Sequence, residues 1–148
     1  LVNLLDHKFV AEEGNRRRYA PNGAAPGQLI DIVYDGGRDF GVGGSGTVHH
    51  IAFDTATDAS QLEVREKVIK GGLMPTQVLD RQYFHSIYFR EPGGVLFEVA
   101  TSPPGFTFDE SVADLGSDLK LPPWVEHRRA YIEQLLEPIE LQPERFAS

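Results

Sequence analysis

The segment that decides the fold is His85-Ser-Ile-Tyr-Phe-Arg90, followed by Glu91-Pro-Gly-Gly94 and Val95-Leu-Phe-Glu-Val-Ala-Thr101. Two stretches with alternating apolar residues flank a turn sequence with proline and two glycines, which is the pattern of a β-hairpin. A third stretch, Thr47-Val-His-His-Ile-Ala-Phe53, repeats the same two-residue alternation upstream. The sequence therefore predicts three strands whose side chains can be sorted by face.

Because side chains alternate across a strand, each face of the predicted sheet has its own chemistry. The apolar face, suited to covering by a helix, carries Ile51, Phe53, Ile87, Phe89, Phe97 and Val99. The opposite face carries His50, Ser86, Tyr88, Leu96 and Glu98. An imidazole, a carboxylate and a phenol together are the ingredients of a metal site with a proton-handling neighbour. On alternation alone, the alternative is a half-exposed sheet on which His50 and Glu98 simply face water.

Composition excludes several classes of function. The 148 residues, 41% of them hydrophobic, suit one domain of ordinary size, while the net charge of −8 argues against nucleic acid or an anionic membrane as the main partner. With no cysteine, thiol catalysis, disulfides and cysteine-based zinc sites are excluded. No apolar run approaches the roughly 20 residues that span a bilayer, and no signal-peptide pattern is present. We therefore expect a soluble protein located in the cytoplasm.

The elements around the hairpin predict one complete unit and part of another. Residues 54–58 offer helix caps, residues 59–70 form an amphipathic helix ended by Gly71-Gly72, and residues 75–79 form a short strand, which gives the order β-α-β-β-β. Residues 1–34 read as a helix end at 1–5 followed by strands at 8–13, 16–19 and 28–34. They match the same unit without its opening strand, so the chain is an incomplete internal repeat.

We therefore expect an α+β fold with three domains. Residues 1–45 form a partial module and a glycine-rich linker, which covers residues 35–46. We expect a linker and not a phosphate loop, because neither Lys-Ser/Thr nor a helix follows the glycines. Residues 46–108 form the complete module, and residues 109–148 form an extension with a helix that begins near Pro122 and ends at Pro138. The chain begins at Leu1, within what looks like an element, so we expect a fragment of a longer protein.

The quoted segments also resemble a known family. Residues 46–53 and 83–101, together with Pro103-Pro-Gly-Phe106 and Leu121-Pro-Pro-Trp124, are similar to the last module of ring-cleaving extradiol dioxygenases of hydroquinone type. These enzymes belong to the glyoxalase/bleomycin-resistance, or vicinal oxygen chelate, superfamily. The resemblance covers most of the chain. It implies glyoxalase-like βαβββ modules and the C-terminal part of a metal-dependent enzyme that cleaves a hydroquinone- or catechol-like aromatic with dioxygen.

The resemblance also implies the metal ligands. In this family iron(II) is held by two histidines and one glutamate, and His50 and Glu98 match one histidine and the glutamate. The other ligand histidine opens a different module, so the third ligand is expected outside this chain. A two-histidine, one-carboxylate site suits iron(II) with open positions for substrate and dioxygen. Manganese, nickel and zinc are the alternative metals.

Two further residues are candidate catalytic groups. Tyr88 lies ten residues before Glu98, the spacing of a tyrosine beside the iron in similar enzymes, and could hydrogen-bond the substrate oxygen; a packing tyrosine is the alternative. His85 is a candidate acid/base, although alternation puts it opposite Tyr88 and a strand end or bulge would have to re-aim it. His49 is expected to be a supporting or core histidine. We expect His7 and His127 at the surface.

Two other classes of function stay open. One is a glyoxalase-type isomerase or lyase with nickel or zinc at similar positions, and the other is a non-enzymatic module whose concave sheet binds a ligand without metal. For the dioxygenase, the expected partners are an aromatic small molecule and dioxygen. The unpaired edge left by the missing strand favours a homodimer or pairing with the missing modules.

Overall fold

The computed structural model describes residues 1–37 and 42–138, so the linker predicted at 35–46 lies partly outside the described residues. The chain divides into two compact units, Leu1–Phe108 and Asp109–Ser148. Each unit is described by itself. The three expected domains, 1–45, 46–108 and 109–148, stay a prediction.

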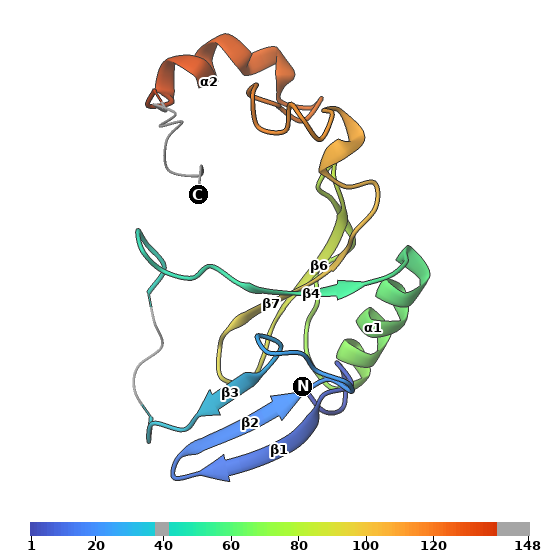
Figure 1. Cartoon of the computed structure of the whole chain (residues 1–148), viewed down its shortest axis with the longest axis vertical. Coiled ribbons are helices and arrows are strands. Elements are labelled where there is room, and N and C mark those ends of the chain that lie inside the picture. The colour runs from blue at the N-terminus through green and yellow to red at the C-terminus, as the bar shows by residue number, and fades with distance from the viewer. Residues whose placement is uncertain (38–41, 139–148) are drawn as a thin grey trace. The chain divides into compact units, whose positions relative to one another are not determined.

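The first unit contains a four-stranded sheet built around the quoted hairpin (Figure 1). Its strands are β4 (Ile51–Thr55), β5 (Leu79–Asp80), β6 (His85–Arg90) and β7 (Leu96–Thr101). Their order is β4-β7-β6-β5, with β4 parallel to β7 and the other pairs antiparallel. Together with α1 (Asp58–Lys70), these strands give the predicted β-α-β-β-β order.

A tight turn sets the register of the hairpin. The Gly94 N–H donates to the Glu91 carbonyl over 2.8 Å, and Gly94 has φ 90°, a conformation that glycine adopts without strain. The turn places Tyr88 opposite Glu98 on the neighbouring strand. Alternation then puts Ser86, Tyr88 and Glu98 on one face and Ile87, Phe89, Phe97 and Val99 on the other, as the sequence predicted.

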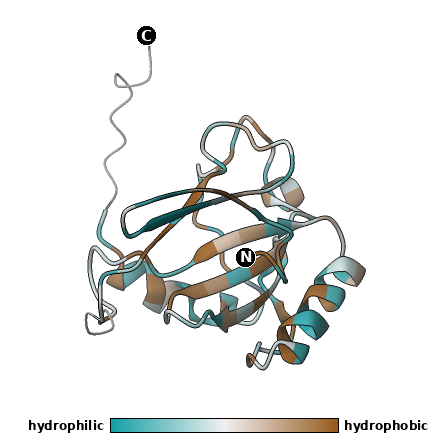
Figure 2. Cartoon of the chain, turned by 90° about the horizontal axis from the view of Figure 1, so that it is seen from below, coloured by the Kyte–Doolittle hydropathy of each residue, from teal (hydrophilic) through white to brown (hydrophobic). Residues whose placement is uncertain are grey.

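Helix α1 covers the apolar face of this sheet. It begins with a capping box in which Thr57 and Ser60 bond each other's backbone N–H groups, and it ends at Lys70 with Gly71 as its C-cap. Figure 2 shows hydrophilic and hydrophobic residues alternating along the helix. Val68 is fully buried with Ile87, Phe89, Phe97 and Val99, and these residues form the core. The helix therefore leaves the polar face of the sheet uncovered by its own module.

A second, three-stranded sheet precedes this module in the first unit. It consists of β1 (Lys8–Glu13), β2 (Arg16–Ala20) and β3 (Ile30–Val33), all antiparallel in sequence order. All of β1 is exposed. On β2 and β3, Arg16 and Arg18 form ion pairs with Asp31 at 2.9 and 2.7 Å. The order and antiparallel pairing of these strands are those of β5, β6 and β7 in the other sheet.

Several element boundaries differ from the sequence predictions. The strand predicted at residues 47–53 begins only at Ile51, which pairs with Phe97. Because β7 starts at Leu96, residues 47–49 lie beyond the end of their partner strand. The strand predicted at residues 75–79 is reduced to Leu79–Asp80. Upstream of it, Thr76 bonds to β6 outside a regular ladder: its N–H donates to the Tyr88 carbonyl oxygen, and its hydroxyl oxygen accepts from the Tyr88 N–H.

The first residues also differ from prediction. The helix end predicted at residues 1–5 is a turn, with one helix-like bond from the Leu5 N–H to the Leu1 carbonyl at 3.0 Å. Leu1, Leu4 and Leu5 pack against the core of the four-stranded sheet. His7 was expected at the surface but is buried: its Nδ1 lies 2.7 Å from the Leu5 carbonyl oxygen and its ring contacts Phe53 edge-on.

Short helices are the regular elements of the described part of the second unit. The helix expected from Pro122 starts later, as the 3₁₀ turn η2 (Glu126–Arg128) followed by α2 (Arg129–Leu135). Pro122 opens a turn in which its carbonyl accepts the Val125 N–H. In the residues covered by the structure, no helix combines the length and apolar character needed to cross a membrane.

Candidate metal centre

Glu98 is the centre of a polar cluster on the uncovered face of the four-stranded sheet. It is 3% exposed, and a buried carboxylate is costly unless hydrogen bonds satisfy it. On the neighbouring strand, the Ser86 hydroxyl donates to Glu98 Oε1, and the Tyr88 hydroxyl donates to the same oxygen over 2.7 Å. Both donors come from β6, so one edge of the carboxylate is fixed by that strand.

The other carboxylate oxygen faces His50. His50 Nε2 lies 2.7 Å from Glu98 Oε2, and the imidazole is 34% exposed. The opposite ring nitrogen, Nδ1, lies 2.8 Å from His49 Nδ1. If His50 donates through Nδ1 to His49, its Nε2 keeps a lone pair for a ligand bond, which is how a neighbouring acceptor fixes the tautomer of a metal-binding histidine.

The two donors fit a metal ion. Nitrogen and carboxylate ligands bind zinc-sized divalent ions at about 2.0 to 2.2 Å, so two neighbouring ligands of one ion lie about 3 Å apart. The 2.7 Å between His50 Nε2 and Glu98 Oε2 is an ion-pair distance, and an ion could replace this contact with only a small separation of the two atoms. Over residues 1–37 and 42–138, no group of three or more potential ligands gathers. The structure thus brings together the two predicted ligands and adds no third one among the described residues.

A groove lies beside this pair. It measures about 600 Å³ and is lined by His50 and Glu98 together with Tyr83, Phe84 and Phe106. The Tyr83 and Phe106 rings lie 5.2 Å apart between centroids. An aromatic-walled groove with a few convergent polar groups suits a flat, apolar ligand that carries a polar substituent.

A cation also lies near the cluster. The Arg81 guanidinium carbon is 5.2 Å from the centroid of the Tyr88 ring, a cation–π distance. This contact holds the Tyr88 ring from one side. On another side the ring meets the His50 imidazole edge-on at 5.9 Å. Tyr88 is therefore constrained at its ring and at its hydroxyl.

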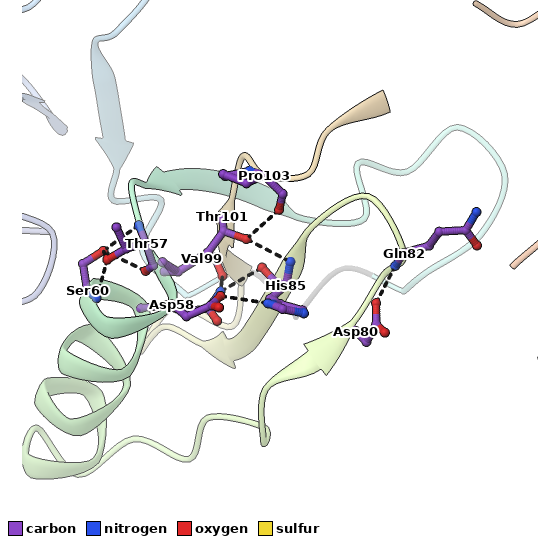
Figure 3. A network of polar contacts seen from close by, with 10 residues as sticks. Thr57, Asp58, Ser60, Asp80, Gln82, His85, Val99, Thr101 and Pro103 are labelled. Atoms are coloured by element: carbon purple, nitrogen blue, oxygen red, sulfur yellow. Dashed lines mark hydrogen bonds and ion pairs between the residues drawn. The ribbon is translucent and has the colours of Figure 1, made fainter. Parts of the chain in front are cut away.

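The structure does not bring His85 to this cluster. His85 Nδ1 lies 2.8 Å from Asp58 Oδ1 at the start of α1, and its backbone N–H donates to the Thr101 hydroxyl (Figure 3). Alternation holds along β6, so His85 is on the face covered by the helix, and no bulge re-aims it toward Tyr88. Its role as a base stays a prediction.

Sequence reasoning placed Ser86 on the correct face but gave it no function. The alternation was the signal that could have found this role, because a serine two residues from Tyr88 lies on the same face and within reach of the same carboxylate. Arg81 and the aromatic groove residues were missed for a different reason. They lie outside the strands or in a turn, where no periodicity assigns a face.

Curated proteins are similar to this chain over most of its length. No family model matches the chain. The chain is 45% identical over 139 residues to "Putative ring-cleaving dioxygenase MhqE" of Bacillus subtilis (strain 168), covering 91% of this chain and 45% of that protein. It is 40% identical over 129 residues to the chlorohydroquinone/hydroquinone 1,2-dioxygenase of Sphingobium indicum, covering 84% of this chain and 39% of that enzyme. The chain thus spans less than half the length of these relatives.

Solved structures agree with the fold. A crystal structure described as a "putative dioxygenase" from Bacillus subtilis superposes with a TM-score of 0.84 at 43% identity, over 92% of this chain and 43% of that chain. A glyoxalase/bleomycin resistance protein/dioxygenase domain from Frankia sp. EAN1pec superposes with a TM-score of 0.56 at 17% identity, over 68% of this chain and 82% of that domain. The second match concerns the fold alone. The predicted glyoxalase-like α+β fold is confirmed.

Proposed function

Because this chain is a relative of ring-cleaving dioxygenases of hydroquinone type and has the glyoxalase/bleomycin-resistance fold, we propose that it is the C-terminal, metal-binding part of such an enzyme. The substrate class would be hydroquinone- or catechol-like aromatics, cleaved with dioxygen in the cytoplasm. The observation that carries this proposal is the 2.7 Å approach of His50 Nε2 to the buried Glu98 carboxylate, on the sheet face that α1 does not cover.

His50 and Glu98 are the residues that would hold the metal. Iron(II), when bound, would supply the redox centre at which the aromatic and dioxygen react; manganese, nickel and zinc are the alternatives. One histidine and one carboxylate leave positions for a further protein ligand and for exogenous molecules. Among the described residues no third potential ligand gathers near this pair, so the third ligand would come from elsewhere.

The groove supports an aromatic substrate. Tyr83, Phe84 and Phe106 offer apolar contacts to a flat ring beside the two polar donors. Hydrophobic walls would also keep water from the reacting carbon atoms. A hydroxyl on the ring could then point toward His50 and Glu98 while the carbon skeleton packs against the aromatic side chains.

Tyr88 would act at the boundary between ligand and substrate. Its hydroxyl donates to Glu98 Oε1, and its oxygen retains lone pairs that can accept a hydrogen bond. A substrate hydroxyl is a suitable donor. The role of Tyr88 is thus to orient Glu98 and to receive a hydrogen bond from the substrate, whereas His85, bonded to Asp58, would have to leave the helix-covered face to act as a base.

A chimera tests the function. This chain would replace the matching segment of the Sphingobium hydroquinone dioxygenase, and the protein would be loaded anaerobically with iron(II). We expect hydroquinone-dependent oxygen uptake, measured with an oxygen electrode, to fall to background in His50→Ala and in Glu98→Ala. His127→Ala is the matched control, because His127 is exposed and is not among the residues that line the groove beside His50 and Glu98.

The opposite results would refute the function. Unchanged oxygen uptake in Glu98→Ala would show that ring cleavage does not use this carboxylate. A chimera that is folded by circular dichroism but takes up no oxygen would show that the chain cannot serve as the metal-binding part. Glutathione-adduct turnover, or tight ligand binding in the presence of a chelator, would favour an isomerase or a non-enzymatic binding module instead.

A further inference from the structure

Ser86 is a polar side chain buried beside the candidate metal ligands. It is 0% exposed and lies on β6, between β5 and β7, with Ala100 opposite it on β7. A buried hydroxyl contributes little packing and carries a desolvation cost unless it is hydrogen-bonded. Its hydroxyl donates to Glu98 Oε1. The hydrogen bond to Glu98 is therefore what a serine provides here that an alanine would not.

The two oxygens of Glu98 have different surroundings. Oε1 accepts from Ser86 and from Tyr88, both on β6. Oε2 instead faces the His50 imidazole from the β4 side of the sheet. A carboxylate oxygen accommodates about two strong donors, so Oε1 is fully occupied and Oε2 is the oxygen left for a ligand bond.

We infer, on the basis of the proposed metal site, that Ser86 is a positioning residue for Glu98. Its hydroxyl acts with that of Tyr88 to hold Oε1, so that Glu98 presents Oε2 alone to the ion. Ligation through one oxygen keeps one more coordination position free than ligation through both. Residues that orient a metal ligand in this way raise the affinity of the site for the ion.

The test is a calorimetric titration of the untagged 148-residue chain with Ni²⁺, which binds nitrogen and oxygen ligands more tightly than Mn²⁺ or Fe²⁺ and is stable in air. We expect Ser86→Ala to bind Ni²⁺ about 10- to 100-fold more weakly, the usual effect of losing a residue that orients a ligand. Tyr88→Phe should also weaken binding, because it removes the other donor to Oε1 and keeps the ring.

Ser60→Ala is the matched control. The Ser60 hydroxyl bonds Thr55 and Thr57 at the start of α1, so its loss should reduce thermal stability without changing the Ni²⁺ affinity. A purely structural role of Ser86 would make Ser86→Ala resemble this control, with a lower melting temperature and parental affinity. If Ser86→Ala does not fold by circular dichroism, Tyr88→Phe decides whether the donors to Oε1 matter.

The outcomes separate the inference from the proposed function. Parental affinity in Ser86→Ala and Tyr88→Phe, together with a large loss in Glu98→Ala, would overturn the inference and leave the metal site standing. Loss in Ser86→Ala alone would support Ser86 and remove Tyr88 from the inference. Equal Ni²⁺ affinity in the parent and in Glu98→Ala would refute the metal site and the inference with it.

Discussion

At the scale of residues, the two adjacent histidines before β4 have different environments. His50 Nε2 reaches Glu98 Oε2, whereas His49 Nδ1 contacts the other ring nitrogen of His50, Nδ1. Alternation along the strand predicts that neighbouring residues face opposite ways, but here both rings lie beside each other because residues 49 and 50 precede the paired part of β4. His50, which contacts Glu98, is therefore the candidate ligand, and His49 is its supporting residue.

Replacing each histidine by alanine should distinguish a ligand from its supporting residue. We expect His50→Ala to eliminate measurable Ni²⁺ binding by the chain, because it removes one of two donors. His49→Ala should weaken binding by about 10- to 100-fold, as is usual when the partner of a ligand is lost. The measurement is calorimetry on both variants. A larger loss in His49→Ala than in His50→Ala would reverse the assignment.

At the scale of elements, the hairpin of β6 and β7 could be predicted almost completely. Alternation and the turn at residues 91–94 give its strands, its register and the faces of Ser86, Tyr88 and Glu98. The start of β4 and the position of β5 could not be predicted, because a strand ends where its partner ends and not where its own pattern ends. The contact between His85 and Asp58 depends on how α1 packs on the sheet, which no local pattern contains.

The turn of this hairpin gives a prediction for stability. Gly94 has φ 90°, so Gly94→Ala should reduce the free energy of unfolding by about 1 to 2 kcal/mol, the cost of a left-handed conformation with a Cβ atom. Urea unfolding measures the change. Gly43→Ala is the control, because a Cβ atom there meets nothing within 4 Å and Gly43 is not among the glycines with positive φ. Equal stability of the two variants would contradict the role of Gly94.

The three-stranded sheet should respond to acid through Asp31. Hydrogen bonds from Arg18 and then Arg16 hold the pKa of Asp31 well below its usual value of 3.8. A carboxyl whose folded pKa is lowered stabilises the fold fully above the unfolded pKa and loses this effect as the pH falls toward the folded pKa.

Acid titration of stability tests this effect. Below about pH 4, the parent chain should lose its stability advantage over Asp31→Asn progressively, as followed by urea unfolding at a series of pH values. Above that pH the difference between the two should stay constant. A constant difference through the acid range would show that the ion pairs on β2 and β3 do not stabilise the sheet.

At the scale of the whole molecule, the two sheets of the first unit differ in completeness. In the four-stranded sheet, β4 pairs in parallel with β7, the last strand of the module. In the three-stranded sheet, β3 occupies the position of β7, and within the described ranges no strand pairs with its free edge. Repetition of the module predicts a parallel strand there, supplied by another segment or by another chain.

Self-association is the expected consequence for the isolated chain. Ile32 and Val33 on this edge strand are 46% and 47% exposed, and apolar edge strands favour pairing between chains. We expect a concentration-dependent dimer in sedimentation velocity, weakened by Ile32→Lys. Val42→Lys is the control, because Val42 is exposed outside both sheets. A chain that stays monomeric at high concentration would contradict the open edge.

The central claim is that His50 and Glu98 hold one metal ion on the uncovered face of the sheet. Its most direct test is anomalous diffraction from crystals of the chain grown with Zn²⁺ and measured at the zinc absorption edge. The account predicts a peak about 2.0 to 2.2 Å from both His50 Nε2 and Glu98 Oε2. A peak bound by His49 or by His85 and Asp58, with none between His50 and Glu98, would contradict it.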